Sequence, residues 1–533
     1  MTDRVSDAPD PSRVDLLQRL TRPAPWDLVV IGGGATGLAV ALDAAARGLD
    51  VALVEAGDFA RGTSSRATKL LHGGVRYLAQ GNIGLVREAL RERTLALRNA
   101  PHLASPLPFV LPLYGARGRW IDRWFYRTGL TAYDWLSGSA SLGATTALSA
   151  SETAIRVPGL RRDGLGGALC YWDGQFDDAR LAVAVARTAL RLGAAAVNHC
   201  PVEELIHDGD RVAGVVARDE ETGRRFALRS RCVVNATGVW VDTIRGMDRG
   251  SGPGLVTLSQ GVHLVVGPEF LGASHAVLVP KTADGRVLFA VPWLGRTLLG
   301  TTDTPCPRPE PEPQALRQEV DLILGESARY LTRPPTRADV TSVWVGLRPL
   351  VQPGAGDRVP TRSLSREHLV RVDPSGLVTV TGGKWTTSRA MAESVLAACS
   401  THGLIPDRPA GATVSLRLVG SPTTAGHPLS AAPGAHLYGT EGARVAALAG
   451  HGTELAPGLT EAMVRFAARQ EQARTVEDVL ARRSRLLFLD ARLAAAIAPR
   501  VGSLLAEELG PGFEPDASVR AFEALAQRYA TVP

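Results

Sequence analysis

The clearest pattern of hydrophobic and polar positions lies near the N-terminus. An apolar run at 27–31 leads into a glycine-rich turn, and after a helix-length interval a second apolar run follows at 51–54. Short buried strands on either side of a helix are typical of a βαβ unit in a parallel sheet. We therefore predict a strand, a turn, a helix and a second strand between Trp26 and about Leu71.

The turn of this unit has the glycine spacing of a dinucleotide site. Gly32 permits a tight turn, Gly34 lets the backbone approach a pyrophosphate, and Gly37 lets the helix pack closely on the strand. Glu55 closes the second strand, where a carboxylate accepts hydrogen bonds from ribose hydroxyls. The alternative is a glycine-rich turn in an ordinary α/β sheet, but strand, turn, helix, strand and acid occur here in the required order.

The rest of the chain divides into strand-rich and helical parts. Residues 1–25 are polar and proline-bearing, and we expect a disordered tail rather than a signal peptide. A cofactor-binding domain with an interleaved cap domain is expected over 26–420, a linker over 421–439, and a helical domain over 440–533. Predicted helices are Val86–Arg98, a helix from Asp177 to about Leu192, one from about Ser388, and several over 460–508, with a capping box at Thr475–Asp478. Predicted strands are Val212–Arg218, Cys232–Ala236, His263–Val266, Arg286–Pro292, Thr297–Thr302 and Leu377–Thr381.

Composition excludes several classes of protein. The 533 residues carry a net charge of +6, which fits an anionic substrate or an anionic membrane surface. The charges are dispersed without a nucleic-acid module, so we expect no nucleic-acid binding. The five cysteines are far apart and form no C-x-x-C, so neither a disulfide framework nor a metal site is indicated, and a reducing compartment is favoured. No apolar run approaches the ~20 residues that span a bilayer.

Two downstream features favour FAD over NAD. Val233–Gly238 resembles the second nucleotide-contacting strand of a split FAD domain. Gly382-Gly383 lies between a strand and a helix, where a helix N-terminus can stabilise the negative charge of a reduced flavin. Each alone is also compatible with a plain strand-ending turn. Their order relative to the first motif favours flavin.

From Trp26 to Asp490 the chain resembles the FAD-dependent, aerobic-type glycerol-3-phosphate dehydrogenases. The motifs that carry this resemblance are T-S-S-R-A-T-K-L-L-H-G-G-V-R-Y-L at 63–78, D-D-A-R-L at 177–181, P-W at 292–293, G-T-T-D at 300–303, G-L-R-P-L at 346–350, S-R-E-H at 365–368, G-G-K at 382–384 and R-T-V-E-D-V-L-A-R-R at 474–483. The resemblance implies a Rossmann-like split FAD-binding domain, a mixed-sheet substrate (cap) domain and a C-terminal all-helical domain. It also implies oxidation of sn-glycerol 3-phosphate to dihydroxyacetone phosphate, with hydride passing to non-covalent FAD and electrons to a quinone.

The same resemblance assigns the site residues. The expected cofactor contacts are Gly32, Gly34, Ala35, Thr36, Gly37, Glu55, Thr63, Ser64, Ser65, Lys69, Leu70, His72, Gly73, Gly74, Val202, Ala236, Thr237, Gly238, Gly346, Gly383, Lys384, Trp385 and Thr386. The expected substrate contacts are Arg76, Tyr77, Arg348, Arg366 and Lys384. Arginine suits the phosphate because its planar fork binds two oxygens at once.

The catalytic base is less sharply defined. His263 corresponds to a histidine near the substrate in relatives, and a histidine titrates in a range that suits proton abstraction. A lone histidine in a strand is more often a hydrogen-bonded core residue. Arg348 is the alternative catalytic group, through electrostatic stabilisation of the developing alkoxide.

Partners and location follow from the basic aromatic stretch Arg117–Arg127. Such a stretch suits a membrane interface, or else the core of a small cap domain. We expect a cytoplasmic enzyme, peripheral on the inner face of the cytoplasmic membrane, and a homodimer. The alternatives are an oxidase that reduces oxygen to peroxide, an amine- or hydroxy-acid-oxidising flavoenzyme, which should lack the phosphate cations, and a flavin-binding sensor or scaffold.

Overall fold

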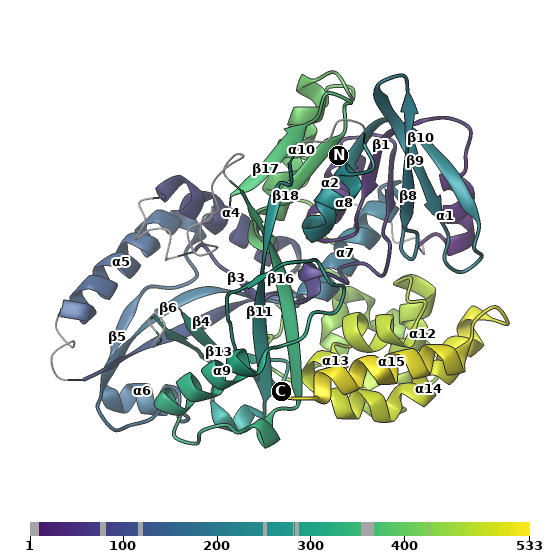
Figure 1. The fold of residues 1–533 in the computed structure, drawn as a ribbon. Helices are drawn as coiled ribbons and strands as arrows, with labels where there is room; N and C mark the ends of the chain where they lie inside the picture. The colour runs from purple at the N-terminus through teal and green to yellow at the C-terminus, as the bar shows by residue number, and fades with distance from the viewer. Residues whose placement is uncertain are drawn as a thin grey trace.

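The computed structural model describes residues 10–74, 82–115, 121–248, 253–280, 282, 287–352, 367–424 and 426–533, with the backbone alone at 121–125 and 139. Figure 1 shows two sheets next to each other and a group of C-terminal helices packed beneath the first sheet. These helices contact the elements of both sheets. Helices α13 (Leu486–Leu489) and α15 (Pro515–Ala530) contact β16 (Ser342–Val351) of the second sheet. The π-helix η9 (Asp478–Arg483) contacts α7 (Asp178–Arg191), which packs on the first sheet.

The first sheet is built from segments far apart in the chain. Its order is β17-β18-β10-β1-β2-β7, with β8 and β9 joined to β10, and the central pairs from β18 to β7 are parallel. The strands are β1 Trp26–Ile31, β2 Val51–Val54, β7 Ala195–Val197, β8 Val202–Asp208, β9 Arg211–Arg218, β10 Arg225–Asn235, β17 His368–Val372 and β18 Val378–Gly382. The core strands are apolar along their length, and β1, β2 and β7 are almost wholly buried, as is typical of a parallel sheet that is covered on both faces.

Three helices pack on this sheet next to the glycine turn. They are α2 (Ala35–Ala46), α7 (Asp178–Arg191) and α10 (Ser388–Thr401), and α2 contacts the other two. The backbone N–H of Arg180 donates to the side chain of the N-cap Asp177 over 3.2 Å. The predicted starts of α7 and α10 are confirmed.

The second sheet forms the cap domain. Its order is β15-β11-β14-β13-β12-β4-β6-β3, with β16 paired to β11 and β5 to β6. The strands are β3 Leu70–Leu71, β4 Ala104–Tyr114, β5 Thr146–Leu148, β6 Leu165–Phe176, β11 Val256–Val266, β12 Ala276–Val279, β13 Leu288–Trp293, β14 Arg296–Gly300, β15 Thr304–Cys306 and β16 Ser342–Val351. Helices α4 Ile83–Asn99, α5 Ile121–Ser137, α6 Ala150–Arg156 and α9 Arg317–Tyr330 belong to the same part of the chain.

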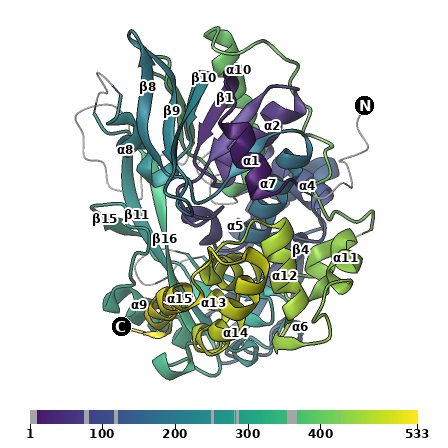
Figure 2. The same ribbon diagram turned by 90° about the vertical axis from the view of Figure 1, so that its right-hand side faces the viewer.

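The C-terminal part is helical, as predicted. Its helices are α11 Gly442–Ala446, α12 Glu461–Gln470, α13, α14 Ala491–Leu509 and α15, and Figure 2 shows the last ones in front of the molecule. The predicted capping box is present: the N–H of Asp478 donates to Thr475 Oγ1 (3.1 Å) and the N–H of Thr475 donates to Asp478 Oδ2 (3.1 Å). No helix among the described residues is long and apolar enough to cross a bilayer.

Two expectations about the ends of domains need correction. The disordered tail is wrong for the described part of residues 1–25, because α1 (Arg13–Leu20) buries Leu16 and Leu20 against the first sheet and contacts β7. Two apolar residues four positions apart in a short helix are a weak signal, and the sheet edge gives them a partner. The described residues of the segment 421–439 are packed as well, since Leu429 and Tyr438 are buried.

Candidate active site

The glycine turn brings two strands and a helix closer together than any side chain allows. Gly32 has a φ of +106°, and a Cβ on it would lie 2.8 Å from the carbonyl oxygen of Ala236, just beyond β10. A Cβ on Gly37 would lie 2.0 Å from the carbonyl oxygen of Gly32. Both positions therefore require glycine, in agreement with the roles expected for them.

The start of α2 is suited to an anion. The N-cap Gly34 supplies no capping side chain, and the first turn, Ala35 to Gly37, contains no acidic residue. Ser64 Oγ accepts a hydrogen bond from the N–H of Ala35 over 2.9 Å, so the hydroxyl group of Ser64 lies at the start of α2. Unpaired N–H groups and the helix dipole favour a phosphate at this place. Thr36, expected to contact the cofactor, lies in the same turn.

Glu55 organises the loop at the end of β2. Its carboxylate accepts from the N–H groups of Gly33 (2.5 Å) and Gly57 (2.8 Å), and the residue stays partly exposed. Each carboxylate oxygen has more than one acceptor site, so ribose hydroxyls can still bind. Together with the start of α2, this donor and acceptor set fits the adenosine and pyrophosphate of FAD.

The residues 55–69, which we call the cofactor loop, carry the next group of expected contacts. The loop includes the 3₁₀ turn η1 (Thr63–Ser65). Thr63 Oγ1 donates to the carbonyl of Leu347 (2.6 Å), and Trp385 Nε1 donates to the carbonyl of Ser64 (2.8 Å). The loop is thereby tied to β16 and to the turn η7 (Trp385–Thr387), where Thr386 also lies.

One expected cofactor contact is wrong. Lys69 is 0% exposed, so no atom of it can touch a ligand. Its ammonium donates to the carbonyl of Ser65 (2.7 Å) and to Asp178 Oδ2 (2.7 Å). Lys69 thus supports the cofactor loop from behind. The motif that contains it indicated the loop but not the direction of this side chain.

The other expected cofactor residues lie at strand ends around the loop. Gly383, with a φ of +73°, joins β18 to η7, and Val202 opens β8. Leu70 belongs to β3 and is followed by His72, Gly73 and Gly74; Ala236, Thr237 and Gly238 follow β10; and Gly346 lies on β16. The N–H of Gly73 donates to the hydroxyl of Tyr133 over 2.9 Å. Their contacts with FAD stay predictions.

Antiparallel register places the expected catalytic residues on one face of the second sheet. Across β11 and β16, His263 pairs with Trp344, Gly261 with Gly346, and Ser259 with Arg348. Residues two apart on a strand point to the same side, so the four side chains and the two glycines between them share a face. The face is turned toward the cofactor loop, because a Cβ on Gly346 would lie 2.8 Å from the carbonyl oxygen of Arg66.

The side chain of Arg348 lies over Gly261, which is diagonal to it across the two strands. A Cβ on Gly261 would be 2.3 Å from Arg348 Nη2, so the guanidinium occupies the space that a side chain would fill. Nη2 donates to Thr301 Oγ1 over 3.2 Å, and Nη1 is 3.8 Å from Asp303 Oδ1. Thr301 and Asp303, both in the G-T-T-D motif, thus orient this cation.

His263 is 2% exposed and held on two sides. Its ring stacks on Trp344, with centroids 4.1 Å apart and an interplanar angle of 17°, and Nε2 is 3.0 Å from Thr68 Oγ1. Among the described residues Nδ1 has no hydrogen-bond partner. Burial, followed by the charges of Lys69 and Arg348, holds the pKa of His263 well below its ordinary value, so the imidazole is neutral.

Not every expected substrate contact can be located. Arg76, Tyr77 and Arg366 lie outside the described residues. Lys384 lies two residues beyond the end of β18, and β18 meets β16 where a Cβ on Gly382 would lie 2.8 Å from Val351 Cγ2. Lys384 therefore follows a strand that touches the strand of Arg348.

Sequence reasoning missed Thr68 and Trp344 as partners of His263, and Thr301 as a partner of Arg348. Thr68 and Thr301 stand inside quoted motifs. For Trp344 a signal was available only in its alternation with Gly346 and Arg348 along one strand.

Comparisons with known proteins agree with this geometry. The family model described as FAD dependent oxidoreductase matches residues 27–398, and the one described as C-terminal domain of alpha-glycerophosphate oxidase matches 412–512. The mitochondrial glycerol-3-phosphate dehydrogenase of Homo sapiens is 40% identical over 94% of this chain and 72% of its own length. A probable mitochondrial glycerol-3-phosphate dehydrogenase of Caenorhabditis elegans is also 40% identical, over 94% of this chain and 73% of its own.

A solved structure gives the same result. The glycerol-3-phosphate dehydrogenase from Bacillus halodurans, complexed with FAD, is 30% identical with a TM-score of 0.78, and the similarity covers 98% of each chain. This likeness extends across both sheets and the C-terminal helices. It confirms the predicted fold class of a split FAD-binding domain, a cap domain and a helical C-terminal domain. The chain belongs to the family of FAD-dependent glycerol-3-phosphate dehydrogenases, and FAD is its cofactor.

Proposed function

We propose that this protein oxidises sn-glycerol 3-phosphate to dihydroxyacetone phosphate and passes the electrons to a quinone. The observation that carries the proposal is the shared face of β11 and β16, where the oriented cation Arg348 and the neutral His263 both face the cofactor loop. A phosphate group needs a cation, and the neighbouring secondary alcohol needs a proton acceptor and a hydride acceptor. Bound non-covalently, FAD supplies the hydride acceptor.

In this proposal the phosphate binds Arg348 and Lys384, joined by Arg76, Tyr77 and Arg366 from the segments outside the described residues. His263 takes the hydroxyl proton. If Nε2 donates its proton to Thr68 Oγ1, the buried Nδ1 keeps its lone pair, and it serves as the base once substrate binding brings the alcohol oxygen to it. Arg348 then stabilises the developing negative charge on the alcohol oxygen as well as the phosphate.

Replacing Lys69 with methionine should change the pH dependence of catalysis. Burial lowers the pKa of Lys69 to about 7, so below that pH its positive charge opposes protonation of His263. Without that charge the pKa of His263 rises, although burial and Arg348 still hold it below its ordinary value, so the acid-side fall of kcat/KM should begin at a higher pH in the variant than in the unaltered enzyme. Initial rates between pH 5.5 and 8.5 measure this. Two profiles of the same shape would contradict the role of Lys69.

The acceptor separates two candidate functions. We propose a quinone, as in the dehydrogenases that the chain resembles. The second candidate is an oxidase that reduces oxygen to hydrogen peroxide. The match of residues 412–512 to the C-terminal domain of alpha-glycerophosphate oxidase is the observation that supports this candidate.

Location and assembly also belong to the proposal. We propose a cytoplasmic enzyme, peripheral on the inner membrane face, that works as a homodimer. The stretch Arg117–Arg127 lies largely outside the described side chains, but the helix α5, which begins inside it at Ile121, exposes 76% of Trp135. An exposed tryptophan near basic residues suits the headgroup region of an anionic membrane. Co-sedimentation with anionic vesicles tests membrane binding. The sedimentation of the protein without vesicles tests whether it forms a homodimer.

The deciding experiment is an anaerobic absorbance spectrum before and after addition of glycerol 3-phosphate. We expect the flavin band near ~450 nm to bleach, because hydride reaches the bound FAD. Admitting either oxygen or a soluble quinone to the reduced enzyme then separates oxidase from dehydrogenase by the rate at which the band returns. A band that stays unbleached removes this substrate. A spectrum restored fastest by oxygen, with peroxide formed, selects the oxidase.

A further inference from the structure

The cofactor loop is tied to the C-terminal domain at both of its ends. Within the two-sheet body it is held at the start of α2, on β16 and at η7, as described above. Further contacts come from a short stretch of the helical domain, residues 478–485. We call this stretch the arginine segment, since it contains Arg482, Arg483 and Arg485.

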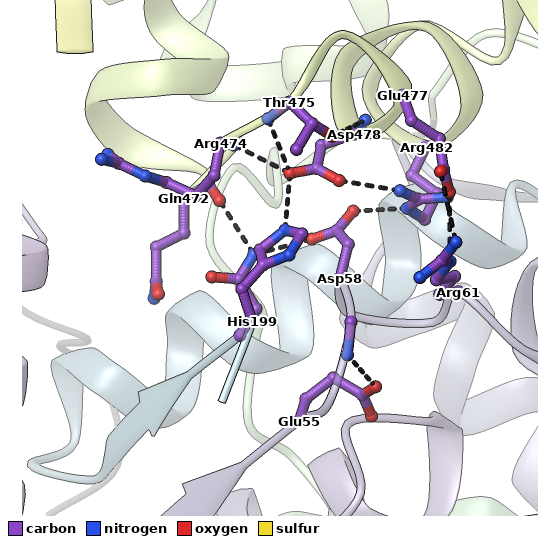
Figure 3. Close-up of polar contacts among 12 residues, drawn as sticks. Glu55, Asp58, Arg61, His199, Gln472, Arg474, Thr475, Glu477, Asp478 and Arg482 are labelled. Atoms are coloured by element: carbon purple, nitrogen blue, oxygen red, sulfur yellow. Dashed lines mark hydrogen bonds and ion pairs between the residues drawn. The ribbon is translucent and has the colours of Figure 1, made fainter. Parts of the chain in front are cut away.

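Two arginines, Arg482 and Arg483, bind Asp58 near the first end of the loop. Figure 3 shows Arg482 beside Asp58, three residues after Glu55. Asp58 is 0% exposed. Its Oδ2 and Oδ1 accept from Arg483 Nη1 (2.6 Å) and Nη2 (2.9 Å), and Oδ2 also accepts from Arg482 Nε. A two-pronged guanidinium contact of this kind fixes the carboxylate in direction as well as in distance.

The third arginine, Arg485, binds the loop near its other end, at Ser65. Arg485 is 0% exposed, and its Nη2 donates to the carbonyl of Ser65 (2.7 Å) and to Asp178 Oδ1 (3.1 Å). Ser65 is the last residue of η1. The same carbonyl accepts from Lys69, so the backbone of the flavin-side turn is held by two buried cations.

The charges around Asp58 favour this structural role over metal binding. Asp58, His199 and Asp478 place ligand atoms within 4.8 Å of one another, which is close enough to hold an ion. Arg482 donates to both carboxylates, reaching Asp478 Oδ1 over 2.8 Å, and His199 Nε2 is 2.9 Å from Asp478 Oδ2. Buried guanidinium groups already balance the negative charge, and a cation would have to displace them.

We propose that the arginine segment is a clamp that sets the cofactor loop in its FAD-binding shape before FAD arrives. Arg482, Arg483 and Arg485 are then positioning residues of the cofactor site, although they lie in another domain and need no contact with FAD. A loop that is correctly placed in only about a tenth of the molecules binds its ligand about tenfold more weakly. The coupling is reciprocal, so bound FAD also strengthens the docking of the C-terminal helices.

The test is the affinity of the full-length apoprotein for FAD, measured by quenching of flavin fluorescence. We expect Arg485→Met and Asp58→Asn each to weaken FAD binding by about tenfold or more, because each releases one end of the loop. The matched control is Arg187→Met. Arg187 is 4% exposed and crosses from α7 to Glu441 of the C-terminal part, but its contacts lie away from the cofactor loop. The affinity of the Arg187→Met protein for FAD should stay within about twofold of that of the unaltered protein.

Two results overturn the clamp. The first is that the Arg485→Met and Asp58→Asn proteins bind FAD as tightly as the unaltered chain, because the loop then takes its shape without the arginine segment. An equal loss of affinity in Arg187→Met shows that domain docking in general is responsible. Should Arg485→Met not fold, Asp58→Asn is judged by the same criteria. Arg485→Lys keeps the charge but replaces the planar guanidinium with a single ammonium group, and it should retain part of the affinity. None of these readouts depends on the alcohol oxidised or on the electron acceptor.

Discussion

Arg348→Ala is expected to lower kcat/KM for glycerol 3-phosphate by about 10²- to 10³-fold, mainly through a higher KM, while FAD stays bound. Truncating one partner of a desolvated charge pair costs about 2–5 kcal/mol, because the other charge is left buried without a partner. Arg348 is already oriented by Thr301 and Asp303, so little of this loss can be recovered by neighbouring groups. Steady-state rates with an artificial electron acceptor give kcat and KM, and absorbance gives the flavin content.

Arg296→Ala is the control for Arg348→Ala. The two arginine side chains are similarly exposed, with 29% for Arg296 and 23% for Arg348, and each lies near an aspartate. Arg296 pairs with Asp490 over 2.9 Å, outside the face shared by β11 and β16. Surface ion pairs of this kind contribute about 0–1 kcal/mol, so KM should stay within about twofold. An unchanged KM in Arg348→Ala would rule out Arg348 as the phosphate ligand.

Gly37→Ala is expected to produce protein with little or no bound FAD. The added methyl group would lie 2.0 Å from the carbonyl oxygen of Gly32, which is backbone and cannot rotate away. The start of α2 must therefore move off the turn, and the N–H groups that would face the pyrophosphate move with it. Overpacking of this severity costs about 1–3 kcal/mol or more, so FAD should bind about 10²-fold more weakly. The ratio of flavin to protein absorbance and an FAD titration measure the effect.

The control for Gly37→Ala is Gly325→Ala in the middle of α9. A Cβ on Gly325 meets no atom within 4 Å, and alanine is the better helix former. We expect full flavin content and a stability gain of about 0.5–1 kcal/mol. A Gly37→Ala protein with normal flavin content would show that α2 can shift without disturbing the cofactor site.

The chemistry follows from where the two sheets meet. The first sheet presents the glycine turn and the cofactor loop, and the second presents Arg348 and His263 on one face. Burial between them keeps His263 neutral and makes the cation of Arg348 effective, since charges interact more strongly away from water. The C-terminal helices lie behind the cofactor loop and contact it through Asp58 and Ser65.

Local sequence determined the elements whose signals lie within a few residues. The N-cap Asp177 and the capping box at Thr475–Asp478 both form as predicted, because a side chain that reaches the backbone three residues away needs no distant partner. The glycine turn is local in part, because Gly37 is required by its contact with Gly32, while Gly32 is required by its contact with the distant Ala236.

Tertiary structure alone decided which distant residues meet. The buried position of Lys69 beside Asp178, the stacking of His263 on Trp344, and the grip of Arg483 on Asp58 join residues far apart in the chain. The helix α1 is ordered because a sheet edge buries its two leucines. Motifs in the sequence therefore determined the cofactor and the βαβ unit that begins its site, and they predicted the cations that we expect to bind the substrate. The direction of each buried side chain, and with it the charge state of His263 and the support of the cofactor loop, depended on packing between segments that no local pattern relates.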